Sequence, residues 1–213
     1  MNAIDTFGEL PSHGTRVTLG LPPNLVHVPV VKQRTDFSCG AAATLALLRF
    51  WLGDAYARVE EHDLFTPLST TPANGTEPEP ITEYLRAAGL EATYLHGDVT
   101  LSHLERAVDN GHPPLVDLQA WRDFEHPWAE VWDAGHYAVL VGYDTEHLFF
   151  MDPSVLTVSG YAYMPRGELN ERWHDLAGPD NRRLERMTVF LRGPGQPLGA
   201  PRGELPTTAM RLG

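Results

Sequence analysis

Hydrophobic positions divide this chain into a helical first half and a second half of short strands. Apolar side chains occupy almost every position from 39 to 51, which predicts a central helix that is buried on all sides. Apolar residues then recur at helical spacing over residues 81–88 and 101–108, and Thr100 is a suitable cap for the second of these stretches. We therefore expect one buried helix followed by two amphipathic ones.

Apolar runs of strand length fill most of the remaining sequence. The predicted strands are Leu25–Val31, Glu91–Leu95, Leu115–Leu118, Tyr137–Val141, His147–Met151 and Met187–Leu191. The proline inside the first of these runs favours an edge position or a strand end. One more helix is expected around Glu168–Leu176. Helices followed by an antiparallel sheet predict the α+β class.

Proline and glycine are concentrated at both ends of the chain. Residues 1–24 and 193–213 show little hydrophobic periodicity and read as extended or mobile flanks. The 213 residues, 42% of them hydrophobic, are enough for one domain with a sizeable core and too few for two such domains. The sequence therefore predicts a single domain over residues 25–192.

Charge and composition narrow the classes of partner. The formal net charge is -12 and no Lys/Arg cluster is present, which argues against nucleic acid or an anionic membrane surface. If charge selects a ligand, it selects a neutral or basic one. The amino terminus lacks the pattern of a secretory signal, and no apolar run reaches the length of a membrane span. We expect a cytoplasmic protein that inserts in no membrane and needs no cofactor.

The only cysteine, Cys39, stands at the start of the predicted buried helix. A lone cysteine forms no intramolecular disulfide, and no C-x-x-C spacing suggests a structural zinc site. At the first turn of a helix the macrodipole favours a thiolate, which is the form that acts as a nucleophile. The alternative is that Cys39 serves only as a small apolar core residue.

A nucleophilic cysteine needs a base, and His136 is the best placed of the ten histidines. It opens the apolar strand 137–141, and the next strand ends at Asp152. In a hairpin centred on Asp144, His136 and Asp152 would face each other on one side of the sheet. A loop longer by one residue would move Asp152 to the other face, so this pairing is conditional.

The order and spacing of these residues resemble the papain-like family of bacteriocin-processing peptidases, which cut leader peptides after a double glycine. The likeness rests on Gln33 six residues before Cys39-Gly40-Ala41-Ala42, on the segment 135–143 that begins Gly-His-Tyr, and on Asp152-Pro153-Ser154. It spans about residues 28–153. The resemblance implies a papain-like fold, in which a buried helix carrying the cysteine packs on a sheet carrying the histidine and aspartate.

The resemblance also implies roles for individual residues. Cys39 would be the nucleophile, His136 the base and Asp152 its orienter, while the Gln33 side chain and the Cys39 backbone N–H would form the oxyanion hole. Ser38 departs from the acidic residue that many members have at this position. Asn74 and the three tryptophans of the segment before the histidine, Trp121, Trp128 and Trp132, are further candidates for contact with substrate. The alternative for the tryptophans is a surface loop packed on the core.

Three functions remain open at this point. The first is a cysteine peptidase or amide hydrolase, and the second is a papain-like acyltransferase in which an amine or thiol resolves the acyl-enzyme. The third is a catalytically silent peptide-binding module of the same fold. A metal site formed by His126, Asp133 and His136 lacks a recognisable ligand spacing, and we expect no metal. The substrate in the first two readings contains a peptide or amide bond.

Overall fold

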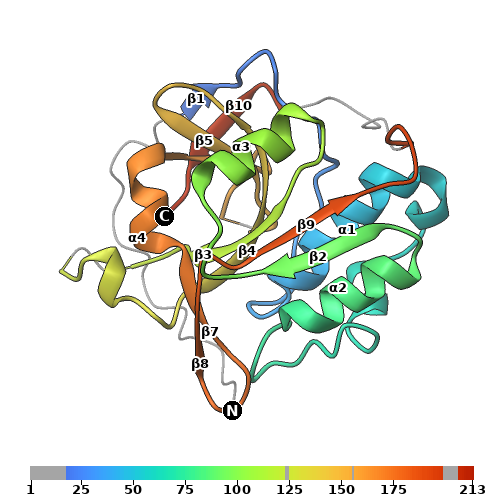
Figure 1. Ribbon diagram of the computed structural model, residues 1–213, viewed down its shortest axis with the longest axis horizontal. Helices are drawn as coiled ribbons and strands as arrows, with labels where there is room; N and C mark the ends of the chain where they lie inside the picture. The colour runs from blue at the N-terminus through green and yellow to red at the C-terminus, as the bar shows by residue number, and fades with distance from the viewer. Residues whose placement is uncertain (1–17, 123–124, 155, 199–205) are drawn as a thin grey trace, which may run out of the picture.

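The computed structural model describes residues 18–122, 125–154, 156–198 and 206–213, and its centre is a twisted eight-stranded sheet (Figure 1). The strands lie in the order β1-β10-β6-β5-β4-β3-β9-β2, and only the pair β10–β6 is parallel. The bounds of these strands are β1 Thr18–Gly20, β2 Glu91–Leu95, β3 Leu115–Gln119, β4 Gly135–Tyr143, β5 His147–Met151, β6 Tyr161–Pro165, β9 Thr188–Arg192 and β10 Thr208–Arg211. A separate ribbon of β7 (His174–Ala177) and β8 (Arg182–Glu185) projects from one end of the sheet.

Helices cover both faces of the sheet. On one face, α1 (Cys39–Leu52) and α2 (Pro78–Ala87) share a core with Tyr137, Val139 and Val141 of β4. On the other face, α3 (Leu101–Asp109) and the short α4 (Leu169–Arg172) pack with Ala138 and Leu140 of the same strand. Because side chains alternate along a strand, β4 contributes to both cores and is buried on both sides. Short 3-10 turns occupy residues 53–56, 61–64, 128–130 and 166–168.

The observed elements confirm the α+β class and most of the predicted helices and strands. Helix α1 is buried at nearly every position, and α3 begins after Thr100, as the pattern predicted. The expected strand 25–31 is wrong: this segment has no strand assignment, although the Val26 N–H donates to the Val141 carbonyl at 2.7 Å. Pro29 within this segment has no N–H to donate, so a regular ladder cannot continue through it. The expected helix 168–176 is also too long, because it ends at Arg172 and the chain continues as β7.

Both predicted flanks contribute to the sheet. β1 pairs with β10 at one edge, and β10 pairs in turn with β6. The predicted division at residues 24 and 193 therefore leaves out two strands, while residues 1–17 and 199–205 lie outside the described part of the chain. Among the described residues, no helix is long and apolar enough to cross a membrane.

The β4–β5 hairpin has a different register from the predicted one. Val139 pairs with Met151 and Leu140 with Phe150, whereas the predicted hairpin placed Leu140 opposite Leu148. The observed pairing is therefore displaced by two residues, and a two-residue displacement keeps each side chain on its face. Toward the loop, the pairing shifts again at a bulge between Leu140 and Gly142. Val141 is the extra residue of this bulge.

Candidate active site

Cys39 is the first residue of α1 and lies where the helix meets the sheet. Its side chain is buried and lines a small cavity together with Tyr137 of β4. Gly40 permits this close approach, because a Cβ atom at position 40 would lie 2.7 Å from the Cβ of Thr76 and 3.1 Å from a ring carbon of Tyr137. The cysteine is thus held between the start of α2 and the strand that carries His136.

His136 is the second residue of β4, and its side chain is 1% exposed. Its Nε2 lies 2.7 Å from Oδ1 of Asp152, which is completely buried. The Trp121 ring packs edge-on against the imidazole, with 4.8 Å between the ring centroids. Because Nε2 is bound to the carboxylate, Nδ1 is the ring nitrogen left to act on another group.

The charge on His136 is set by two opposing effects. Burial disfavours the imidazolium, but the Asp152 carboxylate, its hydrogen bond and hydrogen bonding with Cys39 outweigh burial and raise the pKa of His136 to about 10. For Asp152, burial also works against the charged form, yet His136 and hydrogen bonds from Thr157 and Ser154 lower its pKa. Both shifts favour the charged pair, an imidazolium on His136 and a carboxylate on Asp152.

The loop after Asp152 is fixed by several hydrogen bonds. The Ser154 N–H donates to Oδ1 of Asp152 at 2.8 Å, and the Thr157 hydroxyl donates to Oδ2 at 2.5 Å. The Lys32 ammonium group donates to the carbonyls of Asp152 at 3.2 Å and Ser154 at 2.6 Å, and to that of Thr157. These contacts satisfy both carboxylate oxygens and leave the aspartate little freedom to turn away from His136.

Gln33 is joined to the same loop. Its backbone N–H donates to the Pro153 carbonyl at 2.9 Å, and its side-chain Nε2 donates to the Thr35 carbonyl at 2.8 Å. The side chain is buried, and its Oε1 has no hydrogen-bond partner among the described residues. A primary amide carries two N–H groups, so the bond to Thr35 engages one of them and the other can donate elsewhere.

The cavity beside Cys39 has a volume of about 60 Å³. It is bounded by the start of α1, the segment 74–78 that leads into α2, and residues of β3, β4 and β7. Two of its walls carry carboxyl groups, from Asp117 of β3 and Asp175 of β7. A cysteine at the edge of a cavity is the arrangement expected of a site that binds a ligand next to the sulfur.

Comparison with known families shows to which family the chain belongs. A model of the Peptidase_C39 like family matches residues 25–180, nearly three quarters of the chain. The chain belongs to the Peptidase_C39-like family. Membership of this family indicates cysteine peptidase activity. A comparison with curated proteins gives no match.

Solved structures place the C39-like chain in the papain-like peptidase fold. A double glycine motif protease from an AMS/PCAT transporter, in complex with the leader peptide, has a TM-score of 0.51 at 18% identity, with 84% of this chain and 99% of that chain covered. A protein from Bacillus anthracis described as a C39-like peptidase gives 0.58 at 17%, with 81% and 98% covered. The peptidase domain of Streptococcus ComA, a bi-functional ABC transporter involved in quorum sensing, gives 0.53 at 18%, with 78% and 99% covered.

Of the residues expected from the sequence to contact substrate, only some lie at the cavity of this C39-like protein. Asn74 lines the cavity with Cys39, and Trp121 packs on His136. Trp128 is buried below the guanidinium of Arg172, whose Cζ lies 3.9 Å from the Trp128 ring centroid. The Trp132 ring packs at a tilt against the His174 ring, with 4.2 Å between the centroids. Neither of the last two tryptophans is among the described residues that line the cavity.

Several residues of the site were missed at the level of sequence. Lys32 and Thr157 hold the Asp152 loop, and Asp117 and Asp175 line the cavity. Asp117 did carry a signal, because it is the single charged residue inside an otherwise apolar predicted strand. Lys32, Thr157 and Asp175 belong to no motif in the sequence, and nothing short of the fold singles them out.

Proposed function

We propose that this C39-like chain hydrolyses a peptide bond, with Cys39 as nucleophile, His136 as acid and base, and Asp152 as the group that orients the histidine. The observation that carries the proposal is the buried His136–Asp152 bond of 2.7 Å, made through Nε2, with hydrogen bonding to Cys39 as a further influence on the same ring. Cys-His nucleophilic catalysis requires a histidine that is oriented through one ring nitrogen and acts on the thiol through the other.

In the proposed reaction, the proton of the Cys39 thiol passes to His136, and the resulting thiolate attacks the carbonyl carbon of the scissile bond. The C–S bond forms as the C=O π bond opens, and the carbonyl oxygen becomes an oxyanion. The Gln33 amide and the Cys39 backbone N–H are the donors proposed for this oxygen; loss of one such donor costs roughly 10²–10³ in rate. The imidazolium of His136 then gives its proton to the departing amine as the C–N bond breaks. A thioester remains on Cys39.

Water completes the cycle. His136, now neutral, removes a proton from a water molecule, and the resulting hydroxide attacks the thioester carbonyl. The C–S bond breaks, the carboxylic acid product leaves, and the histidine again carries the proton beside the cysteine sulfur. Support for a peptide as substrate comes from the similar double glycine motif protease, which was solved with a leader peptide.

The test measures Cys39 reactivity and turnover in matched variants. Peptide libraries are incubated with wild type, Cys39→Ala, His136→Ala and His147→Ala, and products are identified by mass spectrometry. His147 is the control because it forms a partly exposed pair with Asp144 on the hairpin, at 3.4 Å. We expect cleavage and rapid alkylation of Cys39 by iodoacetamide in wild type and His147→Ala, and loss of both in His136→Ala.

Two results would redirect the proposal. Diversion of the acyl group to an added amine or thiol would indicate an acyltransferase that uses the same three residues. Cleavage that persists in Cys39→Ala would refute the proposed nucleophile. A Cys39→Ala protein that retains its full biological activity, in the absence of any turnover by wild type, would indicate a peptide-binding module.

A further inference from the structure

The cavity beside Cys39 contains acidic groups that the proposed reaction does not use. Asp117 extends from β3 and Asp175 from β7, and hydrogen bonding joins their two carboxyl groups. Glu77 stands at the start of α2 and also lines the cavity, with its Oε1 accepting from the Gly178 N–H at 2.7 Å. Three carboxyl groups thus meet within reach of the proposed nucleophile.

Asp117 is the decisive member of this group. It is 4% exposed, and its Oδ1 is buried without a hydrogen-bond partner among the described residues. Burial, the neighbouring Asp175 and Cys39 together raise the pKa of Asp117 well above its ordinary value. A buried carboxyl oxygen without a donor costs free energy, so its retention beside the nucleophile calls for a ligand that supplies the missing donor.

Asp175 is held in place by the surrounding backbone. Gln119 Nε2 donates to its Oδ1 at 2.9 Å, and a Cβ atom at Gly135 would lie only 2.0 Å from its Oδ2. Glycine at position 135 therefore leaves the space that this carboxylate occupies, directly before His136. In the described part of the chain, no lysine or arginine forms an ion pair with Asp117 or Asp175.

The remaining lining of the cavity has a different character. Pro78, Tyr137, Leu176 and Ala177 supply apolar surface, and the volume of about 60 Å³ holds the end of one flexible side chain and no large ring system. Lysine and arginine combine an apolar stem with a charged end, and they bury the stem along apolar surface. The cavity has the complementary distribution, with apolar walls and carboxyl groups.

We propose that this cavity receives the charged end of a lysine or arginine side chain of the peptide substrate, next to the scissile bond. The inference rests on the proposed peptidase function and names its substrate class. Asp117 accepts from the ammonium or guanidinium group through Oδ1, and Asp175 and Glu77 add negative charge around it. Asp117 and Asp175 are therefore specificity-determining residues. The net charge of -12 favours approach of basic peptides in the same direction.

The test compares fluorogenic peptides that carry lysine, arginine or norleucine at each of the two positions on either side of the scissile bond. Norleucine has the four-carbon stem of lysine without its charge. We expect kcat/KM for the best lysine or arginine peptide to exceed that for its norleucine counterpart by about tenfold or more. Asp117→Asn and Asp175→Asn should each bring this ratio toward one.

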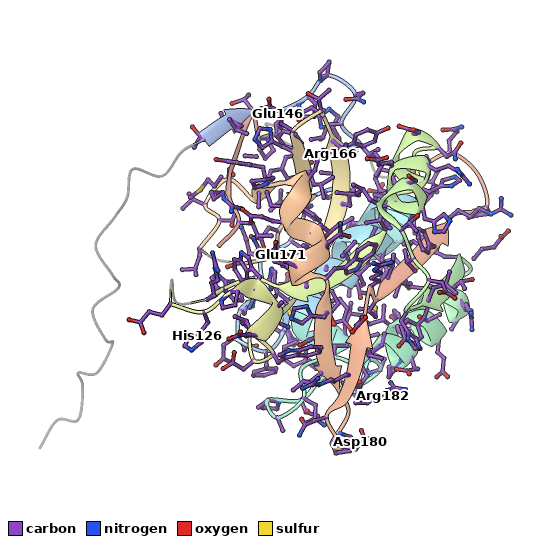
Figure 2. The ribbon with its side chains drawn as sticks, turned by 60° about the vertical axis from the view of Figure 1, so that its left-hand side comes forward. His126, Glu146, Arg166, Glu171, Asp180 and Arg182 are labelled. Atoms are coloured by element: carbon purple, nitrogen blue, oxygen red, sulfur yellow. The ribbon has the colours of Figure 1, made fainter. Side chains whose placement is uncertain are left out.

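Asp180→Asn is the matched control. Asp180 is an exposed acidic residue at the outer end of the β7–β8 ribbon, and Figure 2 shows it beside Arg182 at the tip, whereas Asp175 lines the cavity from the same ribbon. The control should keep the wild-type ratio. Two separate variants guard against loss of folding in one of them, and circular dichroism shows which of them are folded.

A binding measurement separates this inference from the proposed function. Cys39→Ala protein is titrated with the lysine and norleucine peptides, and affinity is read from fluorescence anisotropy. Tighter binding of the lysine peptide, lost on addition of Asp117→Asn, supports the cationic site even if wild type cleaves nothing. Cleavage with equal kcat/KM for lysine and norleucine at every position overturns the inference and leaves the peptidase intact. Equal affinities without any cleavage overturn both.

Discussion

Replacement of Asp152 by asparagine tests the electrostatic centre of the site. The wild-type carboxylate is completely buried and accepts from His136, from the Ser154 N–H and from the Thr157 hydroxyl. Asparagine keeps the shape of the side chain and one acceptor oxygen but removes the charge. His136 then remains buried without the opposite charge that sustains its imidazolium form, so its pKa falls because burial is the effect that remains.

The sign of the pH dependence follows from the direction of each pKa shift. The pKa of His136 is raised in the folded protein from 6.5 to about 10, so between these values the folded state holds a proton that the unfolded state releases. The free energy of unfolding of wild type therefore falls by about 1.4 kcal/mol per pH unit as the pH rises through this window. Asp152 has a lowered pKa, and its contribution is lost as the pH falls below its ordinary value of 3.8.

Asp152→Asn should consequently be least stable relative to wild type from about pH 4 to pH 6.5, the window in which both groups are charged in the folded and in the unfolded state. Removal of one partner of a buried ion pair costs about 3–5 kcal/mol, and that is the loss we expect near pH 6. The difference should shrink steadily toward about pH 9, because wild type loses the contribution that the variant never had.

Urea unfolding followed by circular dichroism, at about pH 6 and about pH 9, measures this difference. Asp144→Asn is the control, because Asp144 and His147 form a hydrogen-bonded pair near the surface, and an exposed pair contributes less than about 1 kcal/mol. A stability difference between Asp152→Asn and wild type that stays constant with pH would refute the reasoning. In that case Asp152 would stabilise the loop without holding the charge on His136.

Three further variants probe the surroundings of the site. Gly135→Ala places a methyl group against the Asp175 carboxylate and should lower stability by about 1–3 kcal/mol, read as a lower Tm in calorimetry. Lys32→Met removes the donor to three carbonyls of the Asp152 loop, so peptide turnover should fall about tenfold or more while the protein stays folded. Asp117→Asn should raise the Tm near neutral pH, by about 2–4 °C per kcal/mol regained, because the asparagine does not have to take up the proton that the buried carboxyl takes up on folding.

For each of these variants, one result would contradict the reasoning behind the prediction. Gly167→Ala is the control for the alanine substitution, because a Cβ atom at Gly167 meets nothing within 4 Å, and equal losses in both variants would remove the packing argument. Unchanged turnover in Lys32→Met would show that the loop holds without its ammonium group. The raised pKa of Asp117 means that wild type loses stability as the pH rises above 3.8, so a gain in Asp117→Asn that persists below that pH would contradict the electrostatic cause.

The helices and the central strands could be predicted because buried faces require apolar residues at regular, local spacings in the sequence. Helix α1 is apolar at nearly every position from Cys39 onward because it is enclosed on all sides, and β4 is apolar without alternation because both of its faces are covered. The edge strand β1 and its neighbour β10 are short and lack such a pattern. They are defined by pairing between residues that lie far apart in the chain, which no local window contains.

The relation between His136 and Asp152 was predicted for a reason that is only partly correct. The hairpin was expected to centre on Asp144 with direct opposition of the two residues, and the observed pairing is displaced by two. The displacement amounts to an even number of residues because Val141 bulges out of the ladder. The Val141 carbonyl accepts a hydrogen bond from the Val26 N–H instead. Without that extra residue, Asp152 would lie on the opposite face from His136.

Asp117 illustrates what the sequence leaves open. An aspartate within an apolar strand is visible as an anomaly, but its meaning depends on Asp175, which is 58 residues further along the chain and belongs to a different strand pair. Only the fold shows that the two carboxyl groups share one cavity with Cys39. The substrate preference inferred from them was therefore beyond reach of the motif that identified the family.

The hydrogen bonds that link Lys32 and Gln33 to residues 152–157 span about 120 residues, and this separation matters while the protein is being synthesised. Cys39 leaves the ribosome roughly a hundred residues before His136 and Asp152. A nascent chain therefore displays the thiol without its base, its orienting carboxylate or the anchor of the Gln33 segment. Contacts of such long range close late in folding, so we expect the thiol to become reactive only after residues 136–157 have been made and have folded onto the helix that carries it.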